Sequence, residues 1–91
     1  MKRAAKHVVF IGRVQGVGFR FTAFNVANRC QLTGMVRNIA GGNVEMIVQG
    51  NPKDIADCIR NIKETYAAQV REVKIEDIAV NPKYQDFKIT F

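Results

Sequence analysis

Residues 8–20 read VVFIGRVQGVGFR, and the order of residue types in this stretch organises the prediction for the whole chain. The apolar run at its start predicts a strand. Two glycines follow, Gly16 and Gly18, and Arg20 stands where a helical pattern begins. Glycines allow successive backbone N–H groups to converge, and a helix start adds partial positive charge. The stretch is therefore either an anion-binding loop that ends on Arg20 or a simple turn with a solvated arginine.

The composition of the chain is that of one small domain. Its 91 residues are 47% hydrophobic and 24% charged, which fits a single globular domain over residues 1–91 with one modest core. No apolar run approaches the length of a membrane span, and the basic residues 1–6 are followed by no cleavage-site pattern. We therefore expect a monomer in the cytoplasm, with residues 1–6 as a flexible basic tail.

The net charge indicates which partners the chain favours, and the two cysteines bear on metal binding and disulfide formation. Fourteen Lys and Arg against eight Asp and Glu give a formal net charge of +6. This excess favours nucleic acid or small phosphorylated or carboxylated molecules, although a generic solvated basic surface fits it too. Cys30 and Cys58 lack the spacing of a metal site, so we expect free, buried thiols, while a disulfide stays open.

The hydrophobic pattern predicts alternating strands and helices. The expected elements are a strand at about 7–14 buried on both faces, a helix from near 21 to before 34, a hairpin over 32–50, a helix from 52, a strand near 73–80 and a last strand at 87–91. A change of phase at Asp77 predicts a bulge or a bend. This order predicts an α+β, ferredoxin-like βαββαβ sandwich: one mostly antiparallel sheet with two helices on one face.

The aromatic residues and the histidine near the loop have structural interpretations. Phe19, Phe21 and Phe24 are expected to anchor the core, although Phe21 or Phe24 could instead border the site. His7 is the only histidine, and no catalytic partner accompanies it in the sequence. We therefore interpret His7 as structural or solvated.

The residue types that are missing from the loop limit its chemistry. No paired carboxylates, Cys/His pair, HExxH motif or P-loop lysine accompanies Gly18, and no metal-ligand cluster is apparent. A phosphate monoester leaves as an alkoxide and usually needs a metal or an acid, whereas an acyl phosphate leaves as a carboxylate whose conjugate acid has a pKa of roughly 4. A site of Arg20, backbone donors and neutral side chains therefore suits an acyl phosphate. Asn38 could orient the water, although an asparagine beside the Gly41-Gly42 turn is commonly a turn former.

The chain resembles the acylphosphatase family over essentially its whole length. The first family signature is Gly-x-Val-x-Gly-Val-x-(Phe/Tyr)-Arg, and it is matched by Gly12, Val14, Gly16, Val17, Phe19 and Arg20. The second begins with Gly, an aromatic, a small residue, a variable position and Asn, and continues as x3-Gly-x-Val-x5-Gly. It is matched by Gly34, Val36, Arg37, Asn38, Gly42, Val44 and Gly50. Met35 departs from the usual aromatic residue, so we expect altered packing there with the chemistry kept.

The resemblance implies a function and a set of site residues. Arg20 and the loop amides would bind the substrate phosphate, and Asn38 would orient the attacking water. The implied phosphate-binding loop consists of Gln15, Gly16, Val17, Gly18 and Phe19. The implied activity is a hydrolase that acts on small-molecule acyl phosphates, releases a carboxylate and inorganic phosphate, and needs no metal and no cofactor.

Two other functions fit the same fold. Residues 9–14 have some likeness to the first-strand motif of RNA-recognition domains, but residues 43–50 contain no aromatic side chain for base stacking. Acylphosphatase-like accessory modules also occur within larger maturation enzymes that act on carbamoyl phosphate. A chain of 91 residues has no room for such further domains. We therefore expect a stand-alone enzyme with no specific nucleic acid partner and no membrane partner.

Overall fold

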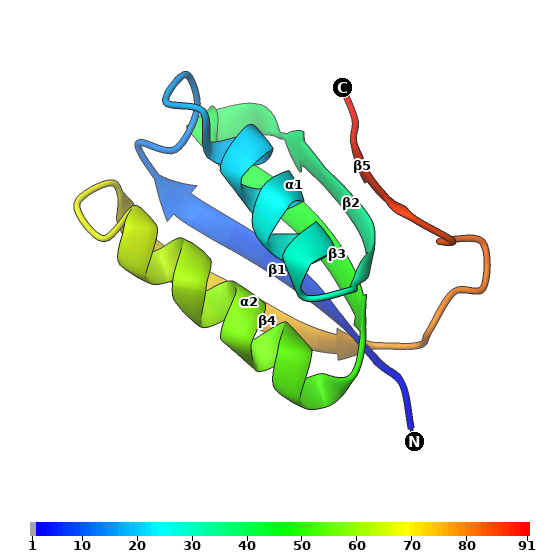
Figure 1. The fold of residues 1–91 in the computed structure, drawn as a ribbon. Coiled ribbons are helices and arrows are strands. Elements are labelled where there is room, and N and C mark those ends of the chain that lie inside the picture. Colours follow the sequence, from blue (N-terminus) through cyan, green and yellow to red (C-terminus); the bar gives the residue numbers. More distant parts are fainter. Residues whose placement is uncertain (1) are drawn as a thin grey trace.

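A computed structural model describes residues 2–91 (Figure 1). The elements in chain order are β1 (Ala4–Gly12), α1 (Phe19–Arg29), β2 (Thr33–Asn38), the 3-10 turn η1 (Ala40–Gly42), β3 (Val44–Gly50), α2 (Pro52–Thr65), β4 (Val70–Ile78) and β5 (Phe87–Ile89). This succession confirms the predicted βαββαβ order, with β5 as an additional short strand. In the described range, no helix is long and apolar enough to cross a membrane.

The five strands form one sheet in the order β4-β1-β3-β2-β5. Neighbouring strands are antiparallel, except that β5 runs parallel to β2. Both helices cover the same face of the sheet (Figure 1). The predicted fold class, an α+β ferredoxin-like sandwich with a mostly antiparallel sheet, is therefore confirmed.

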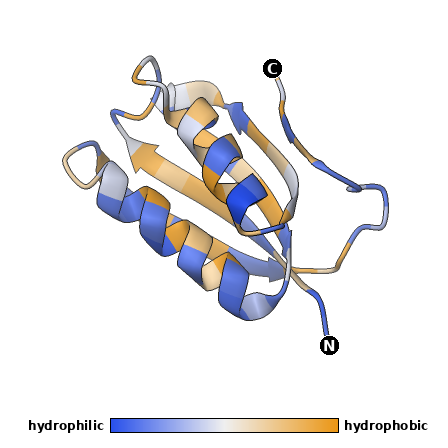
Figure 2. Ribbon diagram, viewed as in Figure 1, coloured by the Kyte–Doolittle hydropathy of each residue, from blue (hydrophilic) through white to orange (hydrophobic). Residues whose placement is uncertain are grey.

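The core lies between the sheet and the two helices (Figure 2). Val8 and Phe10 of β1 are fully buried there, as are their β3 partners Met46 and Val44. Side chains of a strand alternate between the two faces, so the neighbours of Val8 and Phe10 point away from the helices. Those neighbours, such as Val9, are only half-buried. The prediction that the first strand is buried on both faces is therefore wrong, because the helices cover only one.

The first strand begins earlier than its apolar run suggested. It starts at Ala4, and Ala5 is buried between its partners Gln49 and Ile78. Residues 4–6 therefore belong to the sheet and not to a flexible tail, while Met1 lies outside the described residues. The strand ends at Gly12, where the pairing with β4 shifts register.

The prediction of a bulge or a bend at Asp77 is wrong. Asp77 pairs with Lys6, and the register of β4 is continuous from Glu72 to Ile78. The irregularity lies at the other end of the strand pair, between Ile11 and Gly12. The alternation of apolar residues changes phase near Asp77 because β4 is an edge strand that ends at Ile78. The residues after Ile78 lie outside the strand, so packing in the sheet does not constrain their pattern.

The second helix follows its sequence signals closely. The Asn51 side chain accepts a hydrogen bond from the N–H of Lys53 at 2.9 Å, and Pro52 occupies the first helical position. The buried stripe consists of Ile55, Cys58, Ile59 and Ile62. Both cysteines are free, and burial raises the pKa of the Cys58 thiol to about 12.

Candidate active site

The loop between β1 and α1 presents unused backbone donors. Gly16 has φ 80° and Gly18 has φ 77°, a left-handed conformation that favours glycine. Gly18 caps α1 without a side-chain hydrogen bond, so the first N–H groups of the helix lack a cap. Among residues 2–91, no backbone hydrogen bond of ordinary geometry uses the N–H groups of residues 16–19. These donors, together with the positive end of the helix, are suited to bind an anion.

Arg20 adds a full positive charge to these donors. It is the second residue of α1, and none of the ion pairs of the described chain involves it. Its guanidinium lies 5.1 Å from the centre of the Phe91 ring, in a cation–π contact. The five N–H donors of the arginine therefore stay available for an anion.

A pocket of about 270 Å³ brings most of the predicted residues together. Gly16, Gly18, Phe19 and Arg20 line it from the loop and helix, and Asn38 lines it from the end of β2. The remaining lining residues are Val14, Phe21, Ile89 and Phe91. Arg20 is the one ionisable side chain in this described lining, so the pocket combines a cation, an amide and apolar walls.

Two of the predicted loop residues do not line the pocket. The Gln15 side chain turns toward the β2–β3 connection, where its Nε2 donates to the carbonyls of Ile39 at 2.9 Å and Asn43 at 2.8 Å. Val17 points outward and is 45% exposed. Any part that these two residues take in phosphate binding is therefore limited to their backbone N–H groups.

The side-chain amide of Asn38 makes no hydrogen bond to another described residue. Within residues 2–91, its side chain has no hydrogen-bond partner. Its backbone is held by pairing with Val44 of β3, and the next N–H, of Ile39, donates to the carbonyl of Asn43 at 2.9 Å. A positioned, unpaired amide that lines a pocket is able to bind a water molecule there.

Sequence reasoning missed the part of Tyr66 in holding the loop. Its hydroxyl donates to the carbonyl of Val17 at 3.2 Å and shares a hydrogen bond of 2.9 Å with the Thr22 hydroxyl. Its ring packs 4.8 Å from that of Phe19. Tyr66 directly follows α2 in the chain, and no local sequence signal pointed to the loop 49 residues away.

The phenylalanines of α1 divide between the core and the pocket. Phe19 is 1% exposed, and Phe24 packs partly buried against the core. Phe21 is 63% exposed and lines the pocket. The core prediction therefore holds for Phe19 and Phe24 and is wrong for Phe21, which instead lines the candidate pocket.

His7 takes part in a charged cluster on the uncovered face of the sheet. Its Nε2 lies 2.8 Å from Oε2 of Glu45, and the other carboxylate oxygen, Oε1, accepts a hydrogen bond of 2.6 Å from Nε of Arg37. The hydrogen bond with His7 is the largest cause that lowers the pKa of Glu45. None of these three residues lines the pocket. The contact with Glu45 agrees with the interpretation of His7 as a structural residue.

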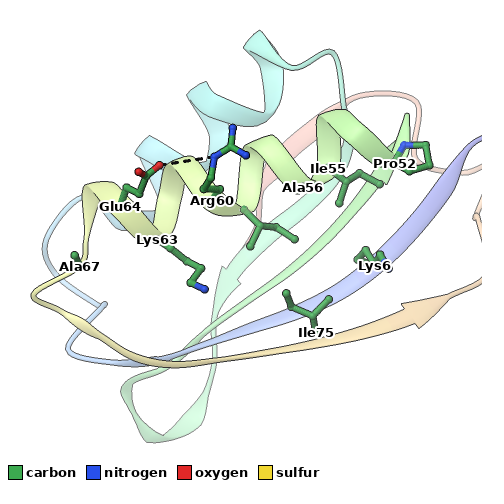
Figure 3. Close-up of a pocket in the computed structure, with 10 residues that line it drawn as sticks. Lys6, Pro52, Ile55, Ala56, Arg60, Lys63, Glu64, Ala67 and Ile75 are labelled. Atoms are coloured by element: carbon green, nitrogen blue, oxygen red, sulfur yellow. Dashed lines mark ion pairs between the residues drawn. The ribbon is translucent and has the colours of Figure 1, made fainter.

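A larger groove of about 720 Å³ lies between α2 and β4 (Figure 3). Its apolar surface comes from residues such as Ile55, Ile59 and Ile75. Charged residues at its border are partly paired, because Arg60 lies 3.9 Å from Glu64 and Lys6 pairs with Asp77. It contains neither the free loop donors nor the unpaired amide, so the smaller pocket is the candidate active site.

Comparisons with known proteins agree in one family. The family model described as Acylphosphatase matches residues 6–89. An acylphosphatase from Geobacillus kaustophilus (strain HTA426) is 41% identical, covering 100% of this chain and 96% of that protein. The structure of an acylphosphatase from Coxiella burnetii superposes with a TM-score of 0.88 and 35% identity, covering 97% and 93% of the two chains. Full-length HypF in the phosphate- and nucleotide-bound form has a TM-score of 0.90 and 37% identity, covering 99% of this chain and 12% of that one.

Proposed function

This chain belongs to the acylphosphatase family and is an acylphosphatase, and from that premise we propose that Arg20, the 15–19 loop and Asn38 carry out its reaction. The reaction is the metal-independent, cofactor-free hydrolysis of the carboxyl–phosphate anhydride. One observation carries the proposal: an unpaired arginine, unused backbone donors and an unpaired amide share one pocket of about 270 Å³.

The phosphate group is bound by the loop and by Arg20. The guanidinium offers a planar fork of donors to two phosphate oxygens, and the loop N–H groups and the start of α1 bind the remaining oxygens. Both sets of donors are already in place before the substrate binds, so little reorganisation opposes the transition state. In such a loose transition state, positioning and charge stabilisation supply most of the catalysis.

The water is oriented by the side chain of Asn38. The oxygen of this water molecule attacks phosphorus. The bond between phosphorus and the anhydride oxygen breaks, and its electron pair leaves on the carboxylate. The carboxylate needs no proton because the pKa of its conjugate acid is roughly 4. The water proton passes to a phosphate oxygen or to solvent, since no described side chain that lines the pocket carries a carboxylate or an imidazole.

Hydrolysis of benzoyl phosphate in the presence of EDTA tests this assignment. We expect activity in the unmodified protein, a loss of about 10²–10³-fold in kcat/KM for Arg20→Ala, and a loss of about 100-fold for Asn38→Ala. Arg13→Ala and Asn25→Ala are the matched controls, because these residues do not line the pocket. Full activity of either site variant with an intact fold, or activity that EDTA abolishes, would contradict the assignment.

The remaining parts of the proposal concern partners and location. We propose a monomeric, cytoplasmic enzyme that acts on a small acyl phosphate and has no specific nucleic acid partner. The uncovered sheet face supports the last point, because its central positions carry His7, Val9 and Ile47 and no aromatic side chain for base stacking. Sedimentation and an RNA titration over a range of salt concentrations test these statements, and dimerisation or salt-resistant binding would contradict them.

A further inference from the structure

Exposed apolar side chains gather around the proposed active site. Among the described residues, the large apolar side chains that are strongly exposed are Val17 at 45%, Phe21 at 63%, Ile75 at 51% and Phe91 at 97%. Single exposed apolar residues are ordinary on a protein surface. Here three of the four lie around the candidate pocket: Val17 lies on the loop, Phe21 at the start of α1 and Phe91 beside Arg20. This concentration calls for a functional explanation.

The apolar border is assembled from two ends of the chain. β5 runs beside β2, with Ile89 paired to Val36, and the N–H of Thr90 donates to the carbonyl of Val36 at 2.8 Å. This pairing brings Ile89 and Phe91 to the pocket that Asn38 lines from β2. The Phe91 ring then lies 5.1 Å from the Arg20 guanidinium.

Resting on the proposed function, we propose that Phe21, Ile89 and Phe91 form a subsite for the acyl group. A phosphate held by Arg20 and the loop places the attached acyl group against this apolar border. The three side chains offer no hydrogen-bond donor or acceptor, so a polar or charged acyl group would lose hydration without compensation. The subsite therefore selects acyl phosphates whose acyl group is apolar, and planar aromatic groups in particular, because they stack on phenylalanine rings.

The size of the preference follows from the area that the acyl group covers. At about 25 cal/mol per Å², burying roughly 60 Å² of apolar surface favours binding by about tenfold. We therefore expect kcat/KM for benzoyl phosphate to exceed that for acetyl phosphate by about tenfold or more. Both substrates carry the same phosphate, so their ratio reports the acyl group alone.

Substitution of the two exposed rings tests the subsite. Phe91→Ala and Phe21→Ala are each expected to lower the benzoyl-to-acetyl ratio by about threefold or more, mainly through benzoyl phosphate. Both residues are strongly exposed, so these variants should fold normally. Ile75→Ala is the matched control, since it removes an exposed apolar side chain from the groove between α2 and β4. Its ratio should stay at the wild-type value.

Two kinetic outcomes would overturn the proposal. An unchanged ratio in both ring variants means that the rings do not touch the acyl group. An equal loss on both substrates in Phe91→Ala means that the ring acts only by orienting Arg20. Phe91→Leu separates these effects further, because leucine keeps an apolar contact and removes the cation–π contact.

A binding measurement keeps this test independent of the proposed catalytic roles. NMR titrations with phenylphosphonate and methylphosphonate compare an aromatic with a small substituent on the same anionic group. We expect tighter binding of phenylphosphonate, and loss of that difference in Phe91→Ala. If neither acyl phosphate is hydrolysed, the proposed function fails, while the two phosphonates still decide the subsite: equal affinities refute it.

Discussion

Gln15 and Gln49 each connect two segments of the chain through side-chain hydrogen bonds. Substitution of these two glutamines therefore gives a matched pair of variants. Gln15 donates from Nε2 to the carbonyls of Ile39 and Asn43, at 2.9 and 2.8 Å, and so ties the 15–19 loop to the turn after Asn38. Gln49 is fully buried and donates to the carbonyl of Asn81 at 2.8 Å, while accepting from the N–H of Asn81 at 3.0 Å. Only the first of these ties lies beside the proposed site.

Gln15→Met removes two hydrogen bonds while keeping a side chain of similar length. Each bond contributes about 0.5–1.5 kcal/mol net, so we expect the free energy of unfolding to fall by about 1–3 kcal/mol. The loop that carries the proposed phosphate donors and the strand end that carries Asn38 then lose their direct connection. Small misplacements of reacting groups cost up to about 100-fold in rate, so we expect kcat to fall by about tenfold or more, with a smaller change in KM.

The assay pairs urea unfolding with steady-state hydrolysis of benzoyl phosphate, and Gln49→Met is the control. The control loses bonds of the same kind at a fully buried position, so its stability should fall at least as far. Its kcat should stay near the wild-type value. The reasoning is refuted if Gln15→Met keeps its kcat despite lower stability, or if both variants lose kcat in proportion to stability.

Two further predictions concern stability. The Thr90 hydroxyl is buried without a partner among the described residues, so Thr90→Val is expected to raise the free energy of unfolding by about 1 kcal/mol in urea titrations; a less stable variant would show that the hydroxyl is satisfied in solution. The hydrogen bond from His7 holds the pKa of Glu45 below its ordinary 4.5, so its contribution to stability is present above that pH and is lost as the pH falls through the lowered value. The stability of Glu45→Gln should therefore fall less steeply than that of the wild type below pH 4.5, and parallel curves would contradict this.

Local sequence determined the elements and most of the loop. Periods of two and of 3.6 residues, with Asn51 and Pro52 at the start of α2, were sufficient to place the strands and helices. The left-handed conformations of Gly16 and Gly18 and the position of Arg20 in the first helical turn follow from short-range geometry. The signatures around Arg20 and Asn38 were sufficient to predict the family, because both lie in contiguous motifs.

Only the tertiary structure decided which face is covered and what surrounds the pocket. The hydrophobic pattern identifies the apolar positions of β1 but does not indicate that both helices pack on one side of the sheet. The prediction that the second face of β1 is buried was therefore wrong. Hydrogen bonds from Gln15 to residues 24 and 28 positions away, and from Tyr66 to Val17 at 49 positions, depend on the packed arrangement of the sheet and helices. The choice of β2 as the partner of the three-residue β5 is equally long-range, and it brings Phe91 to Arg20. A short strand carries too little local information to choose its neighbour, so its place is set by the contacts that it makes in the folded chain.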